Sequence, residues 1–160
     1  MRPILIFLFL LILPLTAAAS PPDNRRALEG LSHAGVIFDV NVGSPTKLLL
    51  RLQLIEETVN GLSHGGVIPE VVVAFRGGAT FFLTEPDKYL PPDDLPHKLN
   101  IQKQVRRLRN LGYRLEQCAV AVRQLNIAPA DIIEDVPLVG NGYVSLIGYQ
   151  NRGFAFVPMD

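Results

Sequence analysis

The sequence predicts one α/β domain of three layers, with a mainly parallel five-stranded sheet and helices on both faces. Strand-like and helix-like segments alternate along the chain, which requires right-handed crossovers and therefore parallel strands. One strand-like segment, Glu70 to Phe75, is almost wholly apolar, as is typical of a strand covered on both faces. The 160 residues suffice for one ordinary domain, and 48% of them are hydrophobic, which excludes a disordered chain.

The first 19 residues have the parts of a secretory signal peptide. Arg2 precedes an apolar run from Ile4 to Leu13, and the small residues Ala17 to Ala19 follow it. The run is shorter than the roughly 20 residues that span the hydrocarbon of a bilayer. We therefore expect cleavage after Ala19 without a lasting membrane anchor, and a periplasmic or secreted protein.

The domain is expected to span residues 35–160, after a flexible polar leader at residues 20–34. Its first strand is predicted at Val36 to Val42. A helix follows from a cap at Ser44 to Gly61. It is indicated by apolar residues at steps of four and three, namely Leu48, Leu52, Ile55, Val59 and Leu62.

A long proline-rich connection, Phe81 to Pro96, comes after the second strand. It is too long for an ordinary loop of this fold class, so its apolar residues are expected to cover a neighbouring subunit. A helix over Leu99–Leu111 and a strand over Tyr113–Gln117 are predicted next. The remaining predicted elements are a short helix, a short strand, a helix and a strand, at Ala119–Leu125, Ile132–Val136, Gly142–Asn151 and Phe154–Val157.

Charge and motifs exclude several functions. Basic and acidic residues number 15 each, and the basic residues from Lys98 to Arg114 lack interleaved aromatics, which disfavours nucleic-acid binding and indicates a solvated helix face. A phosphate-binding loop, a Gly-x-Ser-x-Gly elbow and a His-Glu-x-x-His helix are all missing from the sequence. We therefore expect no nucleotide or flavin cofactor.

An eight-residue segment occurs twice, with His33 in the first copy and His64 in the second. Each copy directly precedes a predicted strand, and a repeated turn is the simpler interpretation. Two imidazoles without a nearby carboxylate or thiolate make a poor ligand set, so no metal site is predicted.

The candidate site lies where the predicted strands end, because ligands bind beyond the carboxyl ends of parallel strands. Asn41, Arg76-Gly77-Gly78 and Cys118 stand at those ends. The helix predicted from Ala119 would direct unpaired N–H groups at the thiol and favour its thiolate. Arg76 would add positive charge, and the two glycines would let an anion approach. The alternative is that Cys118 is a small buried residue packed under a helix.

Several stretches of the sequence resemble the DsrE/DsrF-like family of sulfur-trafficking proteins, over about Gly35 to Pro158. They occur in the order and at the spacing that the family shows. They are Phe75-Arg76-Gly77, the ten residues from Cys118 to Ile127, the five from Val136 to Gly140, and the nine from Gly148 to Phe156.

The resemblance implies a flavodoxin-like domain, a homo-oligomer with a trimer favoured, and a persulfide held on Cys118. The predicted function is that of a periplasmic sulfur carrier or sulfurtransferase-like protein without a cofactor. It would exchange sulfur with a donor or acceptor protein or with a small sulfur compound. The export signal is a departure, because the sulfur-relay members of the family act in the cytoplasm. The alternative function is a non-catalytic module that binds a small anion or a partner.

Overall fold

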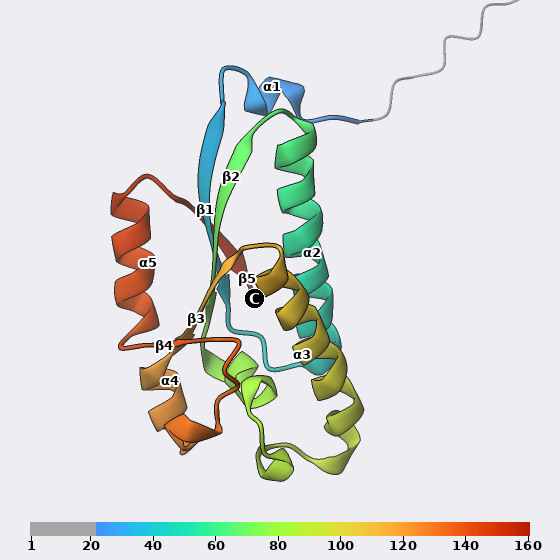
Figure 1. Cartoon of the computed structure of the whole chain (residues 1–160), viewed down its shortest axis with the longest axis vertical. Coiled ribbons are helices and arrows are strands. Elements are labelled where there is room, and N and C mark those ends of the chain that lie inside the picture. Colours follow the sequence, from blue (N-terminus) through green and yellow to red (C-terminus); the bar gives the residue numbers. More distant parts are fainter. Residues whose placement is uncertain (1–21) are drawn as a thin grey trace, which may run out of the picture.

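In the computed structural model, which describes residues 22–160, five parallel strands form one sheet in the order β4-β3-β2-β1-β5 (Figure 1). This confirms the predicted parallel sheet and the flavodoxin-like layering. The expected signal peptide lies outside the described residues, among which no helix is long and apolar enough to cross a membrane. The strands are β1 His33–Val40, β2 Ile68–Phe75, β3 Arg114–Cys118, β4 Leu138–Val139 and β5 Ala155–Met159.

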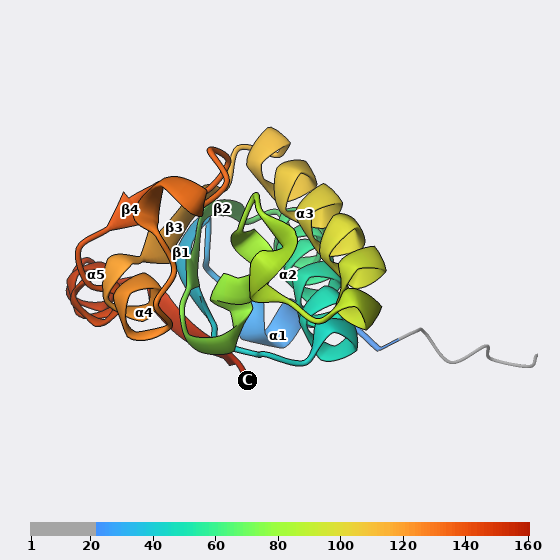
Figure 2. The same ribbon diagram turned by 90° about the horizontal axis from the view of Figure 1, so that it is seen from below.

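The helices lie on both faces of the sheet (Figure 2). From β1 the chain steps to β2 and then β3 in one direction, and right-handed crossovers place α2 and α3 together on one face. The return from β4 to β5 runs in the opposite direction and places α5 on the other face. The helices are α1 Arg25–Leu28, α2 Pro45–His64, α3 Leu95–Asn110, α4 Ala119–Gln124 and α5 Gly142–Asn151.

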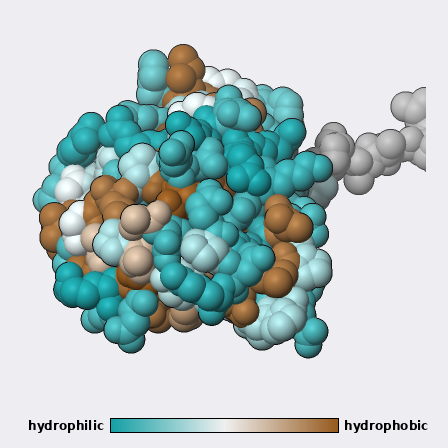
Figure 3. All heavy atoms as spheres, turned by 60° about the horizontal axis from the view of Figure 1, so that its bottom comes forward, coloured by the Kyte–Doolittle hydropathy of each residue, from teal (hydrophilic) through white to brown (hydrophobic). Residues whose placement is uncertain are grey.

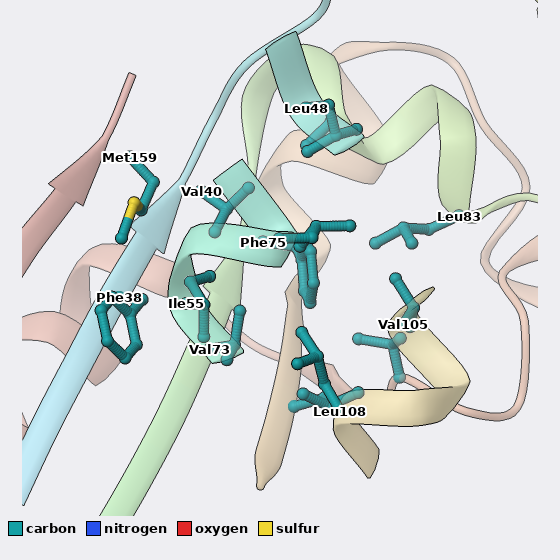
Figure 4. Packing of buried hydrophobic residues seen from close by; sticks show 14 of the residues in the cluster. Phe38, Val40, Leu48, Ile55, Val73, Phe75, Leu83, Val105, Leu108 and Met159 are labelled. Atoms are coloured by element: carbon teal, nitrogen blue, oxygen red, sulfur yellow. The ribbon is translucent and has the colours of Figure 1, made fainter. Parts of the chain in front are cut away.

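The larger core lies between the sheet and the pair α2 and α3 (Figure 4). Every second residue of β1 and β2 faces it, as the side-chain period of a strand requires. The predicted stripe of α2 is confirmed from Leu48 to Val59, because these residues are buried in this core. A smaller core lies beneath α5, where the ring of Phe154 packs over Gly35.

Two boundaries near the start of the domain differ from prediction. The leader expected at residues 20–34 already contains α1 and the first residues of β1, because His33 pairs with Ile68 and Leu28 packs over Gly65. The helix α2 does not end at Gly61 but continues through His64, and the backbone N–H of Gly65 caps it. Gly61 has an exposed helical position at which nothing forces an end.

The predicted fourth strand, Ile132 to Val136, is wrong. The strand β4 is Leu138–Val139, two residues that pair with Gln117 and Cys118. Ile132 instead makes an isolated antiparallel bridge with Thr84, and the N–H of Ile133 donates to the carbonyl of Leu83. These apolar residues are buried against the connection between β2 and α3 and not in the sheet. A short apolar run looks like a strand in the sequence whatever structure buries it.

The connection between β2 and α3 buries several of its apolar residues in its own domain. It winds through three 3-10 turns, of which the first, Gly77–Leu83, buries Phe82 and Leu83. The Nζ of Lys98 donates to the carbonyls of Glu85 and Pro86. Lys98 is therefore buried in α3 and is not part of a solvated basic face.

Candidate functional site

The only cysteine of the chain, Cys118, is the last residue of β3 and is 3% exposed. Its Sγ accepts a hydrogen bond of 3.1 Å from the backbone N–H of Gly142, the first residue of α5. The sequence placed the thiol at the start of the helix that follows it. In the structure Cys118 precedes α4 but makes no side-chain cap bond there, and the N-terminus that meets the sulfur belongs to α5.

Gly142 fits this position because it has no side chain. A Cβ at residue 142 would lie 3.1 Å from the Cβ of Cys118, tighter than ordinary contacts, and 3.5 Å from its Sγ. The start of α5 is held by Asn141, whose side-chain oxygen accepts the backbone N–H of Tyr143. This cap directs the Gly142 N–H at the sulfur.

Arg76 follows β2, the strand beside β3, and is held by two side chains. Its Nε and Nη2 donate to the two carboxylate oxygens of Asp39 at 2.7 and 2.6 Å. Its Nη1 donates to the hydroxyl of Tyr143 at 3.1 Å, and the guanidinium carbon lies 4.8 Å from the centre of the Tyr143 ring. The side chain of Arg76 is 20% exposed and that of Asp39 is 5% exposed, so this pair is largely withdrawn from water.

The charges around Arg76 raise its pKa above the ordinary arginine value. The hydrogen-bonded Asp39 carboxylate is the largest cause, burial opposes it, and Tyr143 and Cys118 add smaller electrostatic contributions. Phe75 pairs with Gln117, so Arg76 and Cys118 stand at the next positions of the neighbouring strands β2 and β3. Tyr143, which bonds Arg76, directly follows Gly142, which bonds the Cys118 sulfur.

Asn41, Gly77 and Gly78 meet at the ends of β1 and β2. Gly77 has φ +55°, a backbone conformation that favours glycine, and a Cβ there would lie 3.2 Å from the carbonyl oxygen of Asn41. A Cβ on Gly78 would lie 2.6 Å from the Cα of Gly43. These glycines thus let two loops of the chain approach each other, whereas the sequence analysis assigned them to the approach of a ligand.

Three residues of the site were not predicted from the sequence: Asp39, Gly142 and Tyr143. A signal existed for Asp39, since it is the one charged residue in the apolar segment from Val36 to Val42 and therefore needs a buried partner. Nothing in the sequence brings the start of α5 to Cys118, because that contact depends on how the chain returns from β4 to β5.

A second polar network lies on the same face of the sheet. Arg114 donates to the hydroxyl of Tyr149 at 2.9 Å, and this hydroxyl donates to one carboxylate oxygen of Glu116 at 2.8 Å. The other carboxylate oxygen is buried without a partner within the described part of the chain. Burial is the largest cause of the raised pKa of Tyr149. The network ties α5 to β3.

The described residues contain no group of three or more His, Cys, Asp or Glu side chains able to hold a metal ion. His33 begins β1 and its Nδ1 lies 3.0 Å from the Oγ of Ser32, while His64 ends α2.

A cavity of about 410 Å³ lies at the amino edge of the sheet, between Ser63 and Tyr113, away from Cys118. At the opposite end, apolar residues gather in patches between hydrophilic ones (Figure 3).

Comparisons with known proteins give relatives without an assigned activity. No protein-family model matches the chain. The chain is 28% identical over 154 residues to an uncharacterized protein of Aquifex aeolicus (strain VF5), and it spans 62% of that protein's length. The solved structure of a protein of unknown function from Methanobacterium thermoautotrophicum has a TM-score of 0.62 at 18% identity, over 78% of this chain and 98% of that one. The structural likeness supports the fold.

Proposed function

We propose that the protein is an exported sulfur carrier in which Cys118 holds a sulfane sulfur as a persulfide. The observation that carries the proposal is the hydrogen bond from the Gly142 N–H to Sγ, together with the nearby guanidinium of Arg76. A backbone donor and a cation are the groups that stabilise a negatively charged sulfur, whether thiolate or persulfide. The resemblance to the DsrE/DsrF-like family supports the same role.

Cys118 can be loaded from a polysulfide by its own thiolate, without a further reactant. The Cys118 thiolate attacks a sulfur of the polysulfide, and a new S–S bond forms at Sγ. The S–S bond between that sulfur and the rest of the polysulfide breaks, and its electron pair leaves with a polysulfide one sulfur shorter. The persulfide carries the charge that the thiolate had, so no oxidant is consumed. Delivery to an acceptor thiolate reverses these bond changes.

The burial of Cys118 supports the second candidate, a non-catalytic binding or assembly module in which the thiol only packs. At 3% exposure, the sulfur resembles that of an inert core cysteine. A carrier of this structure requires the start of α5 to move aside during loading. The two candidates therefore differ in whether the native thiol reacts.

Intact mass after polysulfide treatment tests the proposal. The folded protein is expected to gain the mass of one or more sulfur atoms, removable by a reducing thiol, and the Cys118→Ser variant is expected to gain none. Serine is close to cysteine in size, so the variant should remain folded, as circular dichroism would verify. If the wild-type thiol is modified only in denaturant, Cys118 is a core residue and the carrier function is wrong.

We also retain self-association, with a trimer favoured, as part of the proposal. The outer face of α5 is apolar and supports it. Val144 and Ile147 are 63% and 61% exposed, and the helix contains no charged residue. A helix apolar on all sides is normally buried, and a second copy of the chain is the expected cover.

Self-association predicts a mass above that of the monomer in light scattering. Concentrations of tens of micromolar are adequate, roughly the level at which a standard-size interface persists. Ile147→Asp is expected to reduce the mass to that of the monomer because it adds a charge to the apolar face. Leu99→Asp, on the equally exposed Leu99 of α3, is the control and should change nothing. A monomeric wild-type protein would contradict the prediction.

A further inference from the structure

The segment from Gly140 to Tyr143 lies over Cys118, between Val139 of β4, which pairs with Cys118, and the rest of α5, which Tyr149 bonds to β3. The Gly142 N–H bonds the sulfur, and the next residue, Tyr143, is bound to Arg76. Although Tyr143 is 55% exposed, its side chain has one hydrogen bond and one cation–π contact, both with the guanidinium. Release of Tyr143 from Arg76 therefore loosens the first turn of α5 over the thiol, while Tyr149 keeps the rest of the helix on β3.

The guanidinium of Arg76 has N–H groups that the described residues do not engage. An arginine side chain has five N–H groups, and the described residues engage it in three hydrogen bonds, two with Asp39 and one with Tyr143. The Asp39 carboxylate occupies the edge formed by Nε and Nη2. The Nη1 side has only a neutral hydroxyl as its partner, and a hydrogen bond to an anionic oxygen is about twice as strong as one to a neutral acceptor.

We infer that Tyr143 is a latch on the Cys118 site, and that an oxyanion opens the latch by replacing the Tyr143 hydroxyl on Nη1 of Arg76. The inference rests on the proposed function for the identity of the physiological ligand. A sulfane-sulfur compound that bears an oxyanion, with thiosulfate as the simplest case, fits both groups. Its oxyanion lies on Arg76 while its outer sulfur lies near Sγ.

The transfer from such a donor balances without a co-reactant. The Cys118 thiolate attacks the outer sulfur of thiosulfate, and an S–S bond forms at Sγ. The S–S bond within thiosulfate breaks, and sulfite leaves with the electron pair. The charge on the thiolate remains on the persulfide. In this arrangement Arg76 binds the departing oxyanion, and opening of the latch is coupled to arrival of the donor.

Alkylation of Cys118 by iodoacetamide at fixed pH tests the latch without sulfur transfer. Tyr143→Phe removes only the hydroxyl and is expected to react about tenfold faster than wild type, the effect of losing one hydrogen bond to a charged group. Tyr89→Phe is the matched control, since the hydroxyl that it removes bonds Asp131 and the N–H of Ala128 and has no partner in α5. Its rate is expected to stay within about twofold of wild type.

Sulfate serves as the probe anion because it has the shape and charge of thiosulfate but no sulfur to transfer. At constant ionic strength, sulfate in place of chloride should accelerate alkylation of wild type and have no effect on Tyr143→Phe. The latch is wrong if Tyr143→Phe reacts at the wild-type rate, if Tyr89→Phe accelerates equally, or if sulfate fails to distinguish wild type from Tyr143→Phe.

The two proposals fail separately. If Tyr143→Phe and sulfate act as expected but neither thiosulfate nor polysulfide adds mass to Cys118, the latch is supported and the carrier function is wrong. If polysulfide loads Cys118 while Tyr143→Phe and sulfate leave alkylation unchanged, the carrier function is supported and the latch is wrong.

Discussion

Replacing Asp39 by alanine is expected to lower the free energy of unfolding by about 3 kcal/mol, the lower end of the range for breaking a buried ion pair. Asp39 is buried in β1 and accepts two hydrogen bonds from Arg76. Without the carboxylate, a largely buried guanidinium keeps its charge and loses its partner. The loss is at the lower end because the Arg76 side chain retains 20% exposure and some water can reach it.

Denaturant unfolding of Asp39→Ala and of a matched control measures this effect. Asp23→Ala breaks the ion pair between Asp23 and Arg25, whose side chains are 45% and 83% exposed. An exposed pair of this kind contributes below about 1 kcal/mol. Equal losses in the two variants would show that the Asp39–Arg76 pair is no more important than a surface contact.

Replacing Gly78 by alanine is expected to cost at least about 2 kcal/mol of the free energy of unfolding, within the range for forced overpacking. The new Cβ would lie 2.6 Å from the Cα and 2.9 Å from the N of Gly43. Both of these atoms belong to backbone, so no side chain can rotate away to make room. The loops that follow β1 and β2 must separate, and the adjacent Arg76 would be displaced with them.

Gly61→Ala provides the control for Gly78→Ala. Gly61 lies within α2, and a Cβ there would meet nothing within 4 Å. Alanine is preferred to glycine inside a helix by about 1 kcal/mol, so this variant should be more stable than wild type. Thermal unfolding measures both variants. A Gly78→Ala protein as stable as wild type would mean that the two loops are not in close contact.

Periodicity predicted most of the fold because the strands and helices of this sheet have clear patterns. The apolar run of β2 and the four-and-three spacing in α2 each have one structural interpretation, and both were correct. The segment from Ile132 to Val136 was misassigned because an apolar run shows burial but not which partner buries it. The two residues of β4 are too few to show any period.

The site was predicted only to the extent that it follows the strand ends. Arg76 and Cys118 come together because β2 and β3 are neighbours in the sheet, which their order along the chain suggested. The partners of these two residues come from β1 and α5, at positions where the sequence contains no motif. Cys118 does stand at the start of α4, as the sequence predicted, but the N–H that bonds its sulfur belongs to α5, whose approach no sequence pattern shows.

The pairing of β5 with β1 has a consequence for how the protein is made. These strands come from opposite ends of the domain, yet Val36 pairs with Ala155 and Val40 with Met159. A ribosome must therefore synthesise the whole span to residue 159 before β1 acquires its second neighbour. Contacts so distant along the chain slow folding, and until then the edge of β1 is free to pair with other chains. A nascent chain of this protein is accordingly expected to bind chaperones. It is also expected to remain unfolded long enough to pass through a protein-translocation channel.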